Sequence, residues 1–203
     1  MMNKRPPFRR SVHPRAATIF AVIFSVVSLF ARPASAAEPQ VTEGFINLAT
    51  PEVWKLFTTS AGYQHTGVAQ AEVDLKVGGA IRTHYDPKGR LGDANTIVNE
   101  ILAYEPERML AFRIKQAPAN FPHKDAIAGT WTVIYMNPAG EGMTQVRIVG
   151  LGYNDTPASQ AMRKFFAEGN RSTLDHIAKQ YWPKCAKCVA DEAQAAAAAG
   201  SKK

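Results

Sequence analysis

Two cysteines, Cys185 and Cys188, stand three positions apart near the end of the chain and are its only cysteines. A CxxC pair can close as a disulfide, act as a redox-active thiol or supply two metal ligands. A thioredoxin-like site follows a strand in a βαβ unit, whereas this pair follows a helical segment. A metal would need two more ligands, and only His176 is near in sequence. We expect a disulfide, within the pair or to another chain; the redox and metal roles are alternatives.

Other residues with catalytic chemistry form no known signature. The chain has no GxSxG, HExxH, Walker or GxGxxG motif, so we assign no catalytic residue and no cofactor. Its histidines at positions 65, 84, 123 and 176 are scattered, without the spacing of a metal site. Alternation in "IRTHYDP" places His84 opposite Ile81 and Thr83, which predicts that it faces solvent.

Glu100, in "IVNEI", is the strand carboxylate that could act as a general acid or base if it lay inside a cavity. It alternates with Ile97, Asn99 and Ile101, and a face with two isoleucines is typical of the protein interior. We therefore expect Glu100 on the solvent face of its strand.

The N-terminal 36 residues have the pattern of an export signal. A basic stretch precedes sixteen apolar residues, 16–31, and "RPASA" supplies small residues at positions 34 and 36. The apolar run is shorter than the roughly 20 residues that span a bilayer. We expect cleavage after Ala36 and a periplasmic or secreted protein; an uncleaved leader is the alternative and would be its one membrane contact. The pattern leaves open whether the Sec or the twin-arginine route is used.

The formal charge of +7 belongs mostly to that leader. Six of the 24 Lys and Arg residues, and none of the 17 Asp and Glu residues, lie in the first 36 positions. The rest of the chain is close to neutral and has no basic run that would follow a phosphate backbone. We therefore expect no nucleic-acid partner.

Hydrophobic periodicity organises residues 37–182 into one domain. Thr50 and Pro51 mark a helix start in "TPEVWKLFTT", by the Thr cap and the Pro at the first helical position. A first strand precedes it, and six more with period two and mostly short connections follow. These seven segments are 41–48, 68–75, 80–86, 94–105, 108–116, 129–137 and 143–153.

A long amphipathic helix follows the strands, from the cap Thr156 to Trp182, and Pro183 ends it. Its apolar face can be buried only against the sheet. The order predicts an α+β fold in which a curved antiparallel sheet wraps one C-terminal helix. Residues 183–203 then form a separate Ala-rich, Cys-containing tail.

The segments "TPEVWKLFTT", "AEVDLKVGGAIRTHYDPKG", "VNEILAYEPERMLAFRI" and "GMTQVRIVGLGY" resemble the START-like SRPBCC superfamily, in particular its heat-shock chaperone ATPase activator homologues. The resemblance covers residues 41–182. It implies a helix-grip fold, with a seven-stranded antiparallel sheet around the long helix and a cavity for an apolar ligand between them.

Aromatic and polar residues of the resembling segments are the candidates for lining that cavity. Strand alternation gives Trp131 and Tyr135 one face, and Gly169 leaves out a side chain where the helix faces the sheet. Tyr135, Thr83, Asn99 or Tyr85 could provide a polar handle. The full set of candidates is Trp54, Tyr63, Thr83, Tyr85, Asn99, Phe112, Trp131, Tyr135, Met162, Phe165 and Phe166.

Three functions are consistent with this reading. The first is an exported, soluble binder of a small hydrophobic or amphipathic molecule, lipid-like or aromatic. The second is a cyclase- or aromatase-type enzyme on a hydrophobic substrate, as in polyketide-cyclizing relatives of the fold. The third is a chaperone-activating protein, which export disfavours because the chaperone of that branch is cytosolic. The oligomeric state stays open.

Overall fold

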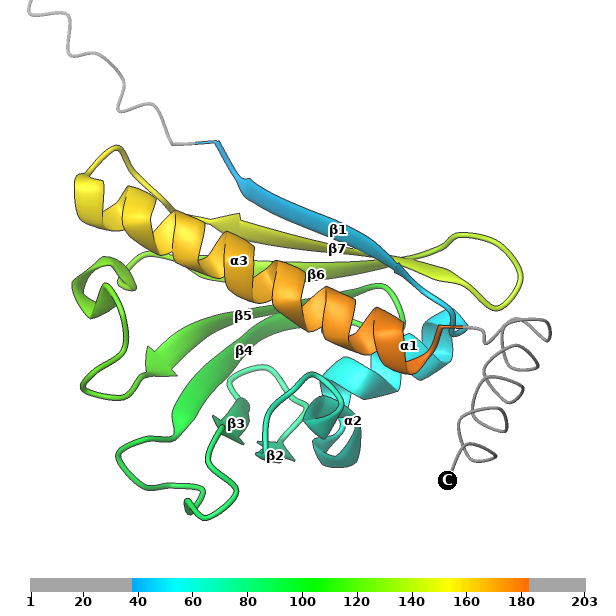
Figure 1. Ribbon diagram of the computed structural model, residues 1–203, viewed down its shortest axis with the longest axis horizontal. Helices are drawn as coiled ribbons and strands as arrows, with labels where there is room; N and C mark the ends of the chain where they lie inside the picture. The colour runs from blue at the N-terminus through cyan, green and yellow to red at the C-terminus, as the bar shows by residue number, and fades with distance from the viewer. Residues whose placement is uncertain (1–37, 183–203) are drawn as a thin grey trace, which may run out of the picture. The chain divides into compact units, whose positions relative to one another are not determined.

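Seven antiparallel strands and one long helix make up the described part of the chain (Figure 1). The structure is a computed structural model, and it describes residues 38–182. The proposed leader with its cleavage site, the tail 183–203 and both cysteines lie outside the described residues. The strands are β1 (Gln40–Ile46), β2 (Gln70–Val73), β3 (Ala80–His84), β4 (Ile97–Glu105), β5 (Met109–Gln116), β6 (Trp131–Pro138) and β7 (Thr144–Leu151).

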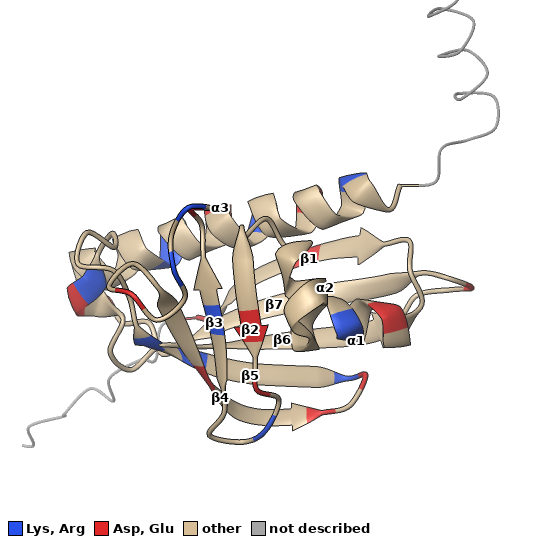
Figure 2. Cartoon of the chain, turned by 90° about the horizontal axis from the view of Figure 1, so that it is seen from below, with Lys and Arg blue, Asp and Glu red and all other residues tan. Residues whose placement is uncertain are grey.

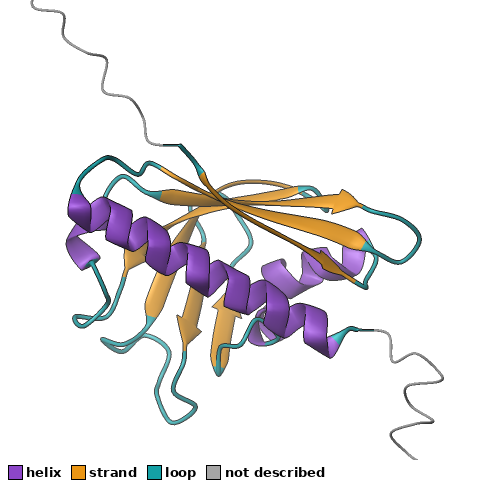
Figure 3. Cartoon of the chain, turned by 45° about the horizontal axis from the view of Figure 1, so that its top comes forward, coloured by secondary structure: helices purple, strands orange, loops and turns teal. Residues whose placement is uncertain are grey.

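The sheet order is β1-β7-β6-β5-β4-β3-β2, so the six later strands form a meander and β1 adds at its end. Four helical segments complete the fold: α1 (Thr50–Thr58), α2 (Ser60–Gln64), the 3₁₀ turn η1 (Lys124–Ala126) and α3 (Pro157–Gln180). Figure 3 shows α3 running across one face of the sheet. This is the predicted helix-grip architecture.

Capping residues define the ends of the two main helices. The hydroxyl of Thr156 accepts a hydrogen bond from the Ser159 amide, 3.3 Å away, and begins α3 as predicted. Helix α1 instead starts one residue earlier than predicted, with Ala49 as the cap. Thr50, the predicted cap, lies beside β7, and its hydroxyl oxygen is 3.2 Å from the hydroxyl oxygen of Thr144. Glu52 completes the turn by accepting from the Ala49 amide.

Helix α3 lies closest to one half of the sheet. Gly44 in β1 allows this approach, because a Cβ there would lie 3.3 Å from Cδ1 of Leu174. Nearby, the side chain of Asn170 donates a hydrogen bond to Gln40 of β1 over 3.1 Å. These contacts hold α3 against β1 and leave space between the helix and the other half of the sheet.

His84 is buried, with 3% of its surface exposed, so the prediction that it faces solvent was wrong. The loop 85–96 folds back over it. The Asp86 amide donates to its Nδ1 over 3.1 Å, and a Cβ on Gly89 would overlap the ring. Its Nε2 lies 3.3 Å from an Asp93 carboxylate oxygen. Strand alternation could not reveal this, because a loop supplies the cover.

Candidate functional site: a cavity under the C-terminal helix

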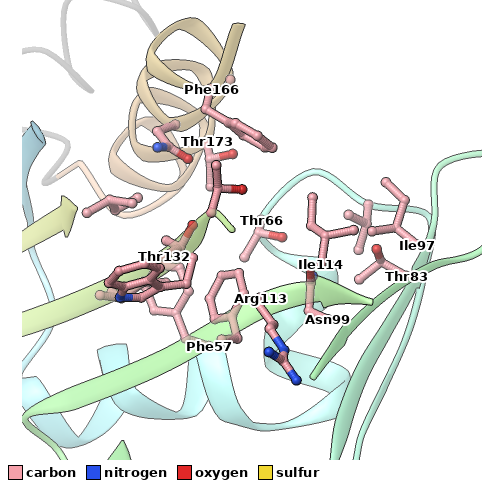
Figure 4. A pocket seen from close by; sticks show the side chains of 18 of the residues that line it. Phe57, Thr66, Thr83, Ile97, Asn99, Arg113, Ile114, Thr132, Phe166 and Thr173 are labelled. Carbon is pink, nitrogen blue, oxygen red and sulfur yellow. The ribbon is translucent and has the colours of Figure 1, made fainter. Parts of the chain in front are cut away.

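A cavity of about 260 Å³ lies between α3 and the concave face of the sheet (Figure 4). Strands β3 to β7 provide its walls, and Phe57 of α1 forms part of its lining. Phe166 and Thr173 of α3 approach from the opposite side to the strands, as Figure 4 shows. Its lining is mostly apolar and includes nine aromatic side chains: Phe57, Tyr63, Tyr85, Phe112, Phe121, Trp131, Tyr153, Phe165 and Phe166.

Eight of the eleven predicted lining residues border this cavity. They come from seven different elements or loops, and the fold brings them together. The eight are Tyr63, Thr83, Tyr85, Asn99, Phe112, Trp131, Phe165 and Phe166.

The other three, Trp54, Tyr135 and Met162, lie outside the lining. Trp54 packs beside Tyr104 with ring centroids 6.3 Å apart, and Phe57 takes the cavity side of α1. Met162, in α3 itself, is fully buried but does not line the cavity.

Tyr135 is 38% exposed because the cavity face of β6 is the opposite of the predicted one. Ile134 and Met136 are buried on the concave side, and Thr132 and Ile134 line the cavity. The pairing of β6 with β5 determines which face of β6 is buried, because Ile134 lies opposite the buried Leu110 of β5. Trp131 still borders the cavity from the beginning of the strand.

The sequence reading missed several lining residues, of which Phe121 is the most distinctive. It is the one aromatic ring in the long β5–β6 connection and packs edge-on to Phe165, with ring centroids 5.5 Å apart. Its ring centroid is 6.3 Å from that of Phe166. A single phenylalanine in this long connection is the signal that could have identified it. The cluster anchors this connection to α3 beside the cavity.

Apart from Arg113, the polar side chains that line the cavity are uncharged. Burial raises the pKa of Tyr63, with a further contribution from Tyr85 nearby. Burial also raises the pKa of Tyr153 to about 12, against the opposing influence of Arg163. Both phenols therefore keep their protons at neutral pH. Asn99 and Thr83 are buried polar residues of the same wall, with 7% and 3% exposure.

Acidic and basic residues are interspersed along the strands, helices and loops (Figure 2). Arg113 counts among the lining residues, but Figure 4 places its guanidinium beyond β5, away from α3. There it donates to Glu100 over 2.9 Å, and this hydrogen bond is the main reason that the pKa of Glu100 is lowered. Glu100 thus faces outward, as predicted.

Within residues 38–182, no group of three His, Cys, Asp or Glu side chains is arranged to hold a metal ion. In the same range, none of the helices combines the length and apolarity needed to cross a bilayer.

Solved structures with this architecture are distant in sequence. Protein MLL2253 from Mesorhizobium loti has a TM-score of 0.54 and 17% identity over 70% of this chain and 95% of its own. The Aha1 dimer from Colwellia psychrerythraea gives a TM-score of 0.50 and 14% identity over 70% of this chain and 96% of its own. The di-domain ARO/CYC protein BexL, of the BE-7585A biosynthetic pathway, gives a TM-score of 0.54 and 15% identity over 70% of this chain and 45% of its own.

No curated relative matches the sequence. A family model does, over residues 39–181, and its description is polyketide cyclase/dehydrase and lipid transport. That range contains every strand of the sheet and helix α3. The chain therefore belongs to the polyketide cyclase/dehydrase and lipid transport family, with the helix-grip fold of the SRPBCC superfamily.

Proposed function

We propose that this protein is exported and binds a small hydrophobic or amphipathic molecule in the cavity under α3. The observation that carries the proposal is an unfilled volume of about 260 Å³ that nine aromatic side chains border. An apolar cavity of about 150 Å³ holds benzene, so this one has room for more than a single ring. Well-formed apolar pockets with a few polar groups are the usual form of ligand sites.

Binding is favoured over catalysis by the chemistry of the lining. Among the described residues that line the cavity there is no carboxylate or imidazole. Glu100, the carboxylate considered for acid-base work, pairs with Arg113 and Lys115 on the outer face. A cyclase- or aromatase-type reaction, the alternative suggested by the family description, would have to rely on phenols that stay protonated at neutral pH.

Export rests on the sequence of the leader, and it also bears on the third function. A protein outside the cytosol does not meet the cytosolic chaperone of the activator branch. The likeness to the Aha1 dimer is one of fold alone, at 14% identity. We therefore do not propose chaperone activation.

Blocking the cavity from the helix side tests ligand binding. Thr173 lines the cavity, so Thr173→Trp places an indole in it; the adjacent Ser172 is exposed on α3, and Ser172→Trp is the matched control. We expect wild type and the control to bind naphthalene or 1-octanol saturably in calorimetric titrations. Thr173→Trp should weaken binding by about tenfold or more, since the indole occupies the ligand volume.

Failure of both probes to bind the wild-type protein would reject the proposed function for ligands of this size. Equal binding by the two tryptophan variants would show that the probes bind elsewhere. Mass analysis of the protein purified under native conditions from its host would identify the natural ligand directly.

A further inference from the structure

Two exposed histidines lie together at the C-terminal end of α3, shortly before the tail 183–203 begins. His65 caps the C-terminal end of α2, and its ring centroid is 6.1 Å from that of Tyr181, the C-cap of α3. His176 lies one turn before Gln180 on the same face of α3. Its ring is next to the α2–β2 loop, because a Cβ on Gly67 would lie 3.8 Å from its Cδ2. Figure 1 shows this end of α3 beside α2.

Hydrogen bonds to Gln180 determine which ring nitrogen of His65 carries the proton. The Gln180 side chain donates from Nε2 to the backbone carbonyl of His65 over 3.1 Å, which fixes the orientation of the amide. Its Oε1 is therefore the atom 3.0 Å from Nδ1 of His65, and it accepts a hydrogen bond from Nδ1. The neutral ring then has its lone pair on Nε2. Histidines that bind metal ions show this arrangement, in which one ring nitrogen donates to an oxygen and the other binds the metal.

The two cysteines of the tail supply the ligands that the histidines lack. Residues 38–182 contain no group of three metal-binding side chains, so the histidines alone are not a site. Cys185 follows Tyr181 by four positions, and four extended residues span up to about 14 Å. This length is sufficient to bring Cys185 to His65, whose ring lies beside that of Tyr181. The sequence offered only His176 as a neighbour of the CxxC pair, and the fold adds His65.

We propose that two histidines and two cysteines together bind one Zn²⁺: His65, His176, Cys185 and Cys188. Two thiolates and two imidazoles are a common tetrahedral ligand set of structural zinc sites, and C-x-x-C is a common spacing in them. Each thiol gives up a proton on binding, and no electron is transferred. The ion would join the beginning of the tail to the α2–β2 loop. This site is separate from the cavity and does not depend on the proposed function.

The metal content of the exported protein is the first test, because a disulfide between the same two sulfurs excludes zinc. The full chain is expressed in a Gram-negative host, and its product is purified without chelators. Elemental analysis and native mass measurement then report zinc and the oxidation state of the cysteines. We expect one zinc ion per chain and two reduced cysteines. A zinc-free protein with a disulfide between Cys185 and Cys188 would reject the proposal.

Substitutions at the histidines are the second test, in zinc titrations of the reduced protein against a chelating indicator. His65→Asn and His176→Asn should each weaken zinc binding by at least about tenfold, since each removes a ligand. His123→Asn is the matched control and should bind as wild type does; His123 is exposed before η1, and asparagine tolerates its φ of 54°. Gln180→Leu keeps all four ligands but removes the acceptor for Nδ1 of His65, and it should weaken binding by about tenfold.

The titrations distinguish the four-ligand site from zinc held by the cysteines alone. Zinc affinity in His65→Asn equal to that in His123→Asn would overturn the proposal, and so would unchanged affinity in Gln180→Leu. Co²⁺ in place of zinc should give the visible absorption of a tetrahedral thiolate site, and Cys188→Ser should reduce it. Thermal melting of the metal-free variants checks that they fold, which we expect because both histidines are exposed.

Discussion

Asn99 and Glu100 are neighbours in β4, and the pleat of the strand gives them opposite surroundings. Asn99 faces the cavity, whereas Glu100 accepts a 2.9 Å hydrogen bond from Nε of Arg113 and lies 3.6 Å from Nζ of Lys115. These contacts lower the pKa of the Glu100 carboxyl below its ordinary value of 4.5, with the Arg113 hydrogen bond as the largest cause. The carboxylate thus helps to join β4 to β5 across the outer face.

The lowered pKa predicts how Glu100 contributes to stability. Because the folded protein binds this proton less readily than the unfolded chain, the stabilisation is present above pH 4.5 and is lost as pH falls through the lowered pKa. Glu100→Gln should unfold at lower urea than wild type at pH 7, and the difference should close in more acidic solution. Urea denaturation at several pH values measures this.

Glu141, exposed in the turn between β6 and β7, is the control, and Glu141→Gln should change stability little at any of these pH values. A difference between Glu100→Gln and wild type that stayed constant down to pH 3 would contradict the ion-pair explanation.

At the scale of elements, the position of α3 relative to the sheet creates the cavity. Close packing on β1, where Gly44 meets Leu174, holds one side of the helix. On the side toward the cavity, Gly169 lines the space, and a Cβ there would have no atom within 4 Å. One glycine therefore permits close approach, while the other borders open space.

This difference predicts opposite effects for two alanine substitutions. Gly169→Ala should raise the free energy of unfolding by up to about 1 kcal/mol, since alanine favours the helix and finds room. Gly44→Ala should lower it, because its Cβ would lie 3.3 Å from Cδ1 of Leu174. Urea denaturation compares both variants with wild type.

Naphthalene binding should survive in Gly169→Ala because one methyl group leaves most of the cavity empty. A destabilised Gly169→Ala protein would show that the helix lies closer to the sheet than the structure has it.

At the scale of the whole molecule, the positive charge of the chain is concentrated in its first 36 residues. The first 36 residues carry six basic side chains and no acidic ones, while the rest is almost neutral. An apolar run with a basic start and small residues at positions 34 and 36 is the pattern that signal peptidase recognises. This supports the proposal that the domain works outside the cytosol.

Export predicts a shortened mature protein. Expression of the full chain in a Gram-negative host should yield a periplasmic product that begins at Ala37, as intact mass measurement would show. Replacing the two small residues, by Ala34→Asp with Ala36→Asp, should block cleavage and leave the precursor at the membrane. A full-length wild-type protein in the cytosol would reject export, and the same mass measurement would report whether Cys185 and Cys188 are oxidised.

Strand and helix periods in the sequence determined the fold class, because they reflect local backbone preferences. The sequence predicts seven strand segments with short connections and a long helix that starts at Thr156 and Pro157. This helix, which spans 24 residues in the structure, can bury its apolar face only against the sheet. The helix-grip arrangement is the simplest fold that satisfies both conditions. The resemblance to the SRPBCC superfamily implied the same arrangement. Because the candidate residues were chosen with this fold in view, eight of the eleven border the cavity.

Only the tertiary structure decided which face of each strand meets the cavity and what covers it. Both faces of β6 carry apolar residues, so the local pattern does not distinguish them. Ile134 pairs with the buried Leu110, and Tyr135 therefore faces outward. His84 is buried by a loop, and Phe121 reaches α3 from a long connection. Alternation defines two faces of a strand, but contacts between distant segments choose the buried one.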